Sequence, residues 1–330
     1  MSEETTGPAL VSTGRLPGPE LVRALVTEAY ERFRDEASGA NSQVYPALAS
    51  VPAEHFGLCV AGTSGNIHVA GDVDVAFTIM SVAKPFVFAL VCEALGAEEV
   101  RERIGANATG LPFDSLAAVE QSADGRTNPM VNAGAIATSS LVPGRTANER
   151  WERVQDGLSR FAGRTVSLDE EVYESVMRTN LRNRDLASLL RSRDRIRVDP
   201  AEAVELYTRQ SCLSVTARDL AVMGATLAGG GVNPVTGDRV VAAETCRYTL
   251  AVMTTAGLYE TSGDWLYDIG LPGKSGIGGG IVTVAPGKGG LGTYAPPLDR
   301  AGNSVRGQLA ARFLSRRLGL DLFASEPTGG

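Results

Sequence analysis

Strand-forming patterns in this chain are confined to two regions, which a long helical stretch separates. Residues 56–70 carry a short apolar run, a Ser-Gly-Asn turn and a second run, which together predict a β-hairpin. Strand patterns return only from Leu271 onward, in the segments GKSGIGGGIVTVAPG and GGLGTYAPP. Residues 97–233 instead repeat apolar positions at helical spacing. The two strand regions are predicted to form one α/β layer, with the helical stretch inserted between them.

The pattern therefore predicts an α/β fold with a discontinuous main domain. We expect an α/β domain from residues 19–96 and 234–322, an all-helical domain from 97–233, and a disordered tail at 1–18. The individual helices are expected within residues 19–36, 77–95, 151–161, 169–178, 184–193, 217–228 and 304–318.

Charge and hydropathy exclude several classes of partner. The net charge of −7 argues against a nucleic acid or an anionic membrane, because phosphate binding needs a basic surface. No apolar run is long enough to span a bilayer. The N-terminus carries Glu3 and Glu4 and lacks the basic-then-apolar pattern of a secretion signal. We therefore expect a cytoplasmic enzyme.

Cysteine and histidine usage limits the chemistry. The four cysteines are scattered without C-x-x-C spacing, which favours buried reduced thiols over disulfides or a zinc site. Only His55 and His68 are present, too few for a His-rich metal site, and neither lies in a motif of a Ser-His-Asp triad. If the chain is a hydrolase, its general base is expected to be another residue type.

Lysine is rare in this chain. Of 31 basic residues only Lys84, Lys274 and Lys288 are lysines, and all the others are arginines. Arginine stays protonated in proteins, whereas a lysine whose pKa is lowered can act as a neutral base. The three lysines are therefore candidates for a role that arginine cannot fill.

Lys84 belongs to the segment Ser81-Val82-Ala83-Lys84, an S-x-x-K pattern at the start of a predicted helix that runs to Leu95. Residues three apart on a helix share a face, so Lys84 Nζ is expected to reach Ser81 Oγ. The helix N-terminus and the apolar neighbours both favour a lowered lysine pKa. On its own, however, the S-x-x-K pattern is common and carries little information.

A second motif, Lys274-Ser275-Gly276, lies on a predicted strand far along the chain. S-x-x-K followed by a downstream K-[ST]-G is typical of the serine β-lactamase and penicillin-binding fold, in which the strand borders the active site. A phosphate-binding loop is excluded, because the spacing differs and a strand rather than a helix follows.

The segment Asn128-Pro-Met-Val-Asn-Ala-Gly-Ala135 would by itself indicate only a turn that leads into a helix. Together with the two lysine motifs it resembles the glutaminase family. The resemblance spans roughly residues 39–318 in colinear order. It continues through Arg182-Asn183, Tyr207, Leu258-Tyr259, Gly270–Gly276, Pro297-Leu298-Asp299 and Gly302-Asn303-Ser304.

The resemblance implies a β-lactamase-like antiparallel sheet flanked by helices, and hydrolysis of L-glutamine to L-glutamate and ammonia. Ser81 matches the family nucleophile, Lys84 its base, and Tyr259 a tyrosine that moves protons near the serine. The backbone N–H groups of Ser81 and Ile277 match the oxyanion hole. The residues that match the substrate-binding positions are Asn132, Asn183, Tyr207, Tyr259 and Ile277.

The resemblance also implies a small-molecule substrate, no metal or organic cofactor, and assembly as a homodimer or homotetramer. Three positions depart from the family. Met80 replaces a glutamine, and Val44 replaces a substrate-facing tyrosine, for which the adjacent Tyr45 could substitute. Val176 replaces a glutamate that pairs with the substrate's α-ammonium group. Loss of one partner of a buried ion pair typically costs about 3–5 kcal/mol.

These departures leave two alternatives beside glutamine hydrolysis. One is a serine amidohydrolase whose amide substrate lacks a free α-amine, such as an N-acylated glutamine. The other is a catalytically silent relative that binds a ligand or a partner. The intact Ser81 and Lys84 argue against the silent relative.

Overall fold

A five-stranded antiparallel sheet joins the two ends of the chain. The structure, a computed structural model, describes residues 15–324. The sheet has the strand order β2-β1-β7-β6-β5, and every neighbouring pair is antiparallel. The strands are β1 (Gly57–Gly62), β2 (Ile67–Gly71), β5 (Gly273–Ser275), β6 (Gly280–Ala285) and β7 (Gly289–Tyr294). The predicted hairpin is confirmed as β1–β2, and β1 pairs with β7, so the two strand regions share one sheet as predicted.

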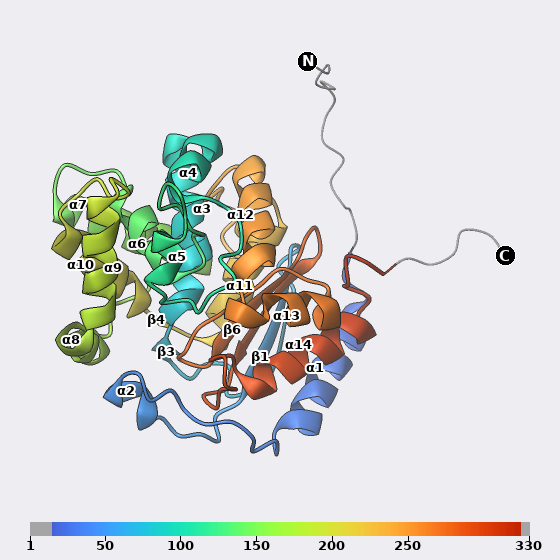
Figure 1. Ribbon diagram of the computed structural model, residues 1–330. Helices are drawn as coiled ribbons and strands as arrows, with labels where there is room; N and C mark the ends of the chain where they lie inside the picture. Colours follow the sequence, from blue (N-terminus) through green and yellow to red (C-terminus); the bar gives the residue numbers. More distant parts are fainter. Residues whose placement is uncertain (1–14, 325–330) are drawn as a thin grey trace.

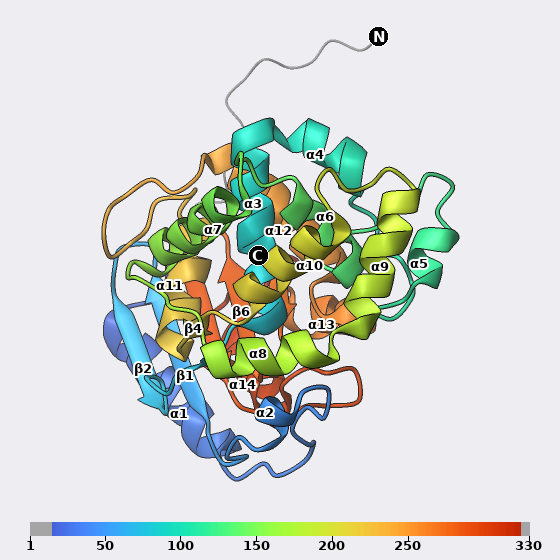
Figure 2. The same cartoon turned by 90° about the vertical axis from the view of Figure 1, so that its left-hand side faces the viewer.

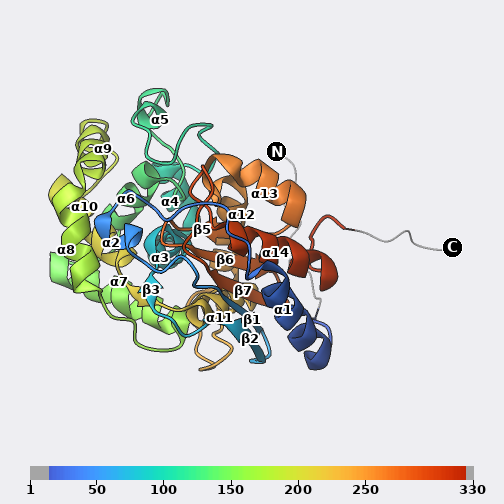
Figure 3. The same cartoon turned by 90° about the horizontal axis from the view of Figure 1, so that it is seen from below.

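Helices cover both faces of this sheet. On one face, α1 (Pro19–Phe33) and α14 (Val305–Arg317) lie side by side (Figure 1). Leu58 and Val60 of β1 belong to the apolar cluster on this face. Cys59, between them, packs on the opposite face against α11 (Ala217–Ala228), because successive strand side chains point to opposite faces. Seen from below, α1 and α14 lie along the sheet, with the group α8 to α10 at the far side of the molecule (Figure 3).

Two glycines of β7 let α11 approach the sheet closely. A β-carbon at Gly292 would overlap the carbonyl oxygen of Ala217, and one at Gly290 would overlap the carbonyl oxygen of Ala221. Absence of side chains at these positions therefore lets helix backbone lie on strand backbone. Helix α11 falls within residues 97–233, the range predicted as the helical domain, yet it packs on the sheet. The predicted division into domains stays a prediction.

Most of the remaining helices form a group beside the sheet, in which α6 and α7 pack against α3 and α10 packs against α6, α8 and α9 (Figure 2). The helices of this middle part are α4 (Ala97–Ile104), α5 (Ala117–Glu120), α6 (Asn132–Ser140), α7 (Ala147–Ala162), α8 (Glu170–Thr179), α9 (Leu181–Ser192) and α10 (Pro200–Ser211). The other helices are α2 (Pro46–Ala49), α12 (Ala243–Ala256) and α13 (Ser262–Ile269), and a small second sheet pairs β3 (Phe77–Thr78) with β4 (Ser214–Val215). Within the predicted tail, residues 15–18 form no helix or strand, and residues 1–14 lie outside the described residues.

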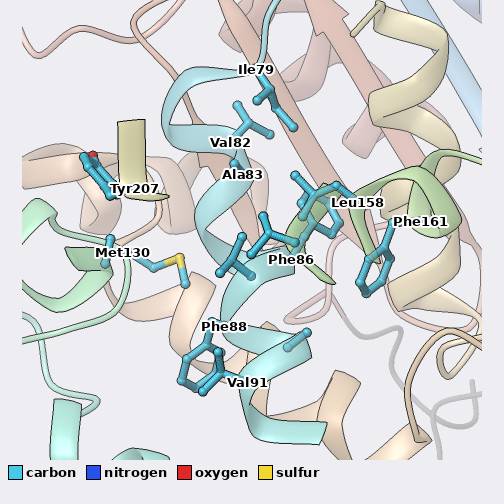
Figure 4. Packing of buried hydrophobic residues seen from close by; sticks show 14 of the residues in the cluster. Ile79, Val82, Ala83, Phe86, Phe88, Val91, Met130, Leu158, Phe161 and Tyr207 are labelled. Atoms are coloured by element: carbon cyan, nitrogen blue, oxygen red, sulfur yellow. The ribbon is translucent and has the colours of Figure 1, made fainter. Parts of the chain in front are cut away.

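Helix α3 (Ala83–Leu95) is a largely buried helix that carries Lys84, the last residue of the S-x-x-K segment. It is apolar on nearly all sides, as expected for a helix surrounded by protein. Phe86 packs against Phe161 of α7, with ring centroids 5.0 Å apart (Figure 4). The predicted helix over 77–95 divides into β3, the 3-10 turn η1 (Met80–Val82) and α3. Ser81 therefore lies in the turn that leads into a helix fixed on all sides.

Candidate active site

Ser81 is positioned by a strained turn. The residue before it, Met80, has φ of 48°, in the left-handed region that non-glycine residues rarely adopt. Ile79 anchors the turn by donating its N–H to Leu213 O at 2.9 Å. Non-glycine residues held in this region typically carry about 1–3 kcal/mol of strain and cluster at functional sites. Ser81 itself is 8% exposed and lines a cavity of about 140 Å³.

Lys84 is buried just below Ser81, with 2% of its surface exposed. Its Nζ donates to Asn132 Oδ1 at 2.7 Å and to Met130 O at 3.4 Å. Burial lowers the pKa of Lys84 to about 7, and the charge of Asp114 acts weakly in the opposite direction. Among the described residues, Lys84 has these two hydrogen-bond partners, and Ser81 is not one of them.

Two tyrosines from different parts of the chain lie near Ser81. Tyr207 of α10 donates its hydroxyl hydrogen to Asn132 Oδ1 at 3.0 Å, and Tyr259 donates to Ser275 O at 3.1 Å. Burial raises the pKa of both phenols, while the nearby Ser81 hydroxyl lowers it to a smaller extent. Tyr259, with φ of 57°, is a second non-glycine residue in the left-handed region. Backbone strain therefore occurs on both sides of the serine.

Lys274 of β5 is a second fully buried lysine. Its Nζ donates to Gly257 O at 2.9 Å and to Ser275 O at 2.6 Å, and lies 4.4 Å from the centroid of the Tyr259 ring. Burial, and to a smaller extent the nearby Lys84, lower the pKa of Lys274 well below its usual value. The third lysine, Lys288, lies away from this cluster, where it donates to Gly319 O. Two of the three lysines are thus buried beside Ser81, as their scarcity suggested.

The end of β5 packs directly on the turn that holds Ser81. A β-carbon at Gly276 would lie 3.0 Å from Ile79 O and 3.3 Å from Ser81 N. The next residue, Ile277, lines the same cavity as Ser81. Within residues 15–324, neither the N–H of Ser81 nor that of Ile277 donates to a carbonyl in the turns and loops. The oxyanion hole formed by these two amides stays a prediction.

The cavity gathers most of the predicted substrate-binding residues. Those that line it with Ser81 are Tyr45, Asn132, Asn183, Tyr207 and Ile277. Tyr259 and Lys84 do not line the cavity and are buried behind it. Burial raises the pKa of Tyr45 to about 12, and Val44 beside it is 56% exposed at the rim. The sequence-adjacent tyrosine therefore faces the cavity even though Val44 stands at the family position.

A chain of side-chain hydrogen bonds runs from Lys84 across the cavity wall. Asn132 Nδ2 donates to Asn183 Oδ1 at 3.0 Å, and Asn183 Nδ2 donates to Asn180 Oδ1 at 2.6 Å. Asn180 Nδ2 then donates to Thr208 Oγ1 at 2.8 Å. Sequence reasoning missed Asn180 and Thr208. The i, i+3 spacing of Asn180 and Asn183 could have indicated the first, whereas Thr208 is set by the packing of α10 on α9.

Val176 of α8 also lines the cavity and is 4% exposed. Glu174 does not replace the missing acid, because its carboxylate lies in solvent 3.8 Å from Arg178. The cavity wall at this position is therefore apolar.

Three further results concern the described part of the chain. All four cysteines are free and buried, as predicted. In residues 15–324, no cluster of histidine, cysteine, aspartate or glutamate has a composition suited to a metal ion. No helix within the same range is long and apolar enough to cross a membrane.

An antiparallel sheet covered by helices on both faces, with an S-x-x-K segment beside its edge strand, defines a β-lactamase-like protein. Comparison with known proteins identifies the family. The glutaminase family model matches residues 39–323, so this chain belongs to the glutaminase family.

Individual relatives agree with this assignment. "Glutaminase 2" of Yersinia pestis is 66% identical over 96% of this chain and 93% of its own length. The solved structure named "Probable glutaminase ybaS" superimposes with a TM-score of 0.91 at 42% identity, covering 93% of this chain and 99% of that one. The glutamate form of Mglu superimposes with a TM-score of 0.88 at 37% identity, covering 96% of this chain and 72% of that one.

Proposed function

We propose that this glutaminase hydrolyses the side-chain amide of L-glutamine through an acyl-enzyme on Ser81. The family membership supports the overall reaction, which gives L-glutamate and ammonia. The residue roles rest on the geometry of the cavity, in which the amide end of the substrate faces Ser81. The amino-acid end then meets Asn132, Asn183 and Tyr207.

The hydrogen bonds of Lys84 carry the mechanism. A neutral lysine has two N–H bonds and one lone pair, and a pKa of about 7 makes this form abundant at neutral pH. Asn132 Oδ1 and Met130 O accept the two N–H bonds, which leaves the lone pair for the hydroxyl proton of Ser81. Lys84 can therefore act as the general base without losing its anchors.

In the acylation step, Ser81 Oγ bonds to the amide carbon and its proton passes to Lys84 Nζ. The oxygen that gains negative charge accepts hydrogen bonds from the N–H groups of Ser81 and Ile277. The proton is then delivered to the leaving nitrogen, by way of Tyr259, and ammonia departs. In the second step, a water gives one proton to Lys84 and its oxygen bonds to the ester carbon. The bond from this carbon to Ser81 Oγ then breaks, Oγ takes the proton back from Lys84, and glutamate leaves.

Replacement of the nucleophile tests this proposal. Ser81→Ala is expected to lower the rate of ammonia release from glutamine by at least about a thousandfold, as typical for loss of a catalytic serine. Ser175→Ala, at a buried serine outside the cavity, is the matched control and should retain wild-type turnover. Activity of Ser81→Ala within tenfold of the wild type would refute the mechanism. Homo-oligomeric assembly and a cytoplasmic location remain parts of the proposal that this test leaves open.

A further inference from the structure

Glutamine presents a charged α-ammonium group to the cavity that contains Ser81. An ammonium removed from water needs an opposite charge nearby, because an unpaired ion carries a large desolvation penalty. The wall formed by Val176 offers no such charge, and Glu174 lies in solvent. A substrate with this charge must therefore find its partner elsewhere in the cavity.

The cavity contains one candidate. Among the described residues that line it, Asp114 is the only acidic side chain, and Arg182 is the only arginine or lysine. Arg182 Nε lies 3.9 Å from Asp114 Oδ2, and the two side chains are 53% and 41% exposed. Both charges thus remain accessible from the cavity mouth.

Three contacts hold Asp114 against the reacting groups. Arg182 Nε donates to the backbone carbonyl of Asp114 at 3.0 Å. The N–H of Asn132 donates to the carbonyl of Phe113 at 2.8 Å, so the preceding residue is tied to the start of α6. The Phe113 ring also packs on Tyr259, with centroids 4.7 Å apart. The Phe113–Asp114 segment is therefore held by contacts with Arg182, Asn132 and Tyr259.

The charge of Asp114 also acts on the cavity interior. Burial is the main cause of the lowered pKa of Lys84, and the charge of Asp114 opposes it. Burial is likewise the main cause of the raised pKa of Tyr45, and Asp114 adds to it. Coulomb interactions decay with distance, so these effects agree with a carboxylate in the neighbourhood of both Lys84 and Tyr45.

We propose that Asp114 binds the α-ammonium group of the substrate and so determines specificity for a free amino acid, with Arg182 holding the Asp114 loop in place. The inference rests on the proposed function, since it assigns the recognition of the substrate whose amide Ser81 attacks. In this proposal Asp114 takes the role of the glutamate that Val176 replaces, although it lies in a different part of the chain.

The test compares two substrates that differ only in the α-ammonium. L-glutamine carries it, and glutaramate has a hydrogen in its place. Asp114→Asn should raise KM for glutamine by about tenfold to a hundredfold while kcat changes little, since a charged partner is lost without a change of shape. For glutaramate, kcat/KM of Asp114→Asn should stay within about threefold of the wild type.

Two further variants sharpen the result. Glu174→Gln removes a carboxylate that lies in solvent on α8 and is expected to leave KM for glutamine unchanged. Adding Val176→Glu to Asp114→Asn places a carboxylate at another position of the cavity lining and should recover at least part of the lost glutamine affinity. Asp114→Glu, which keeps the charge on a longer side chain, should alter KM for glutamine but not for glutaramate, and serves if Asp114→Asn unfolds.

An unchanged KM for glutamine in Asp114→Asn would overturn the inference, as would an equal loss with both substrates. Ser81→Ala separates this failure from failure of the proposed function. If Ser81→Ala is inactive and Asp114→Asn behaves as the wild type, only the role of Asp114 is wrong. If Ser81→Ala stays active, the acyl-enzyme mechanism itself fails, whatever Asp114 does.

Discussion

The hydrogen bond between Asn132 and Lys84 provides a test of Lys84 as the general base. The substitution Asn132→Asp replaces the side-chain nitrogen of Asn132 by an oxygen. In Asn132→Asp a carboxylate oxygen would stand 2.7 Å from Lys84 Nζ, where the amide oxygen now lies. The substitution nearly preserves shape, and the new oxygen can still accept the proton of Tyr207. It also removes the Nδ2 donor that Asn183 Oδ1 accepts, so the diagnostic result is a shift of the pH profile and not a loss of rate alone.

The direction and size of the effect follow from Coulomb's law. An opposite charge favours the protonated lysine, so the pKa of Lys84 must rise from its present value of about 7. At 2.7 Å the interaction is about 6 kcal/mol at an effective dielectric constant of roughly 20, before desolvation of the new carboxylate is subtracted. Carboxylates beside a cation typically shift a pKa by about 1–3 units, and we expect a shift in that range.

The assay is the pH dependence of kcat/KM for ammonia release. Neutral Lys84 is the active form, so the wild-type rate should fall about tenfold per pH unit below about pH 7. In Asn132→Asp this acidic limb should move up by about 1–3 pH units, so that activity recovers in alkaline buffer. Asn183→Asp, one hydrogen bond further away, is the control and should move the limb less. An acidic limb that stays in place in Asn132→Asp, with activity reduced equally at every pH, would refute Lys84 as the base.

Two other substitutions probe the surroundings of Ser81. Gly276→Ala would place a β-carbon 3.0 Å from Ile79 O and 3.3 Å from Ser81 N, so it should lower kcat by about tenfold or more while thermal unfolding changes little, and wild-type kcat would contradict the close packing. Lys84→Met should abolish turnover and remove part of the pH dependence of stability. Between about pH 7 and 10 the unfolded chain binds a proton that folded Lys84 lacks, so wild-type stability rises with pH by up to about 1.4 kcal/mol per unit from this residue. The urea midpoints of the wild type and of Lys84→Met, measured at pH 7 and pH 9, show the difference. An equal change of midpoint with pH in both proteins would contradict a lowered lysine pKa.

Much of the fold could be predicted because its signals are local. Alternation and a turn indicated the β1–β2 hairpin, and helical spacing indicated α1, α8, α11 and α14. By contrast, the position of a helix relative to the sheet depends on contacts with residues that are distant in sequence. Helix α11 lies on the sheet because Gly290 and Gly292 of β7 leave room for its backbone, and these glycines are distant from it in sequence.

The residues of the candidate site also fall into those that local motifs indicate and those that only the folded structure brings together. Ser81, Lys84 and the strand at Lys274 were found from motifs of three or four residues. Asn180, Thr208 and Asp114 belong to no such motif. They join the cavity wall only because α9, α10 and the loop before α5 converge there. A residue of this kind becomes recognisable once its neighbours are known.

The sequence by itself placed a serine three residues before a lysine, and it kept this lysine where arginine is otherwise used. The spacing indicated that the two side chains lie close together, and side-chain chemistry marked the lysine as a candidate base. In the structure Ser81 lies in η1 before α3, and Lys84 donates to Asn132 and Met130 rather than to Ser81. Only the tertiary structure lowers the pKa of Lys84 to about 7. The pKa falls because the side chain of Lys84 is almost fully buried, and Asn132 and Met130, from a distant segment, accept its N–H bonds. Burial is a property of the assembled chain, and no local pattern contains it.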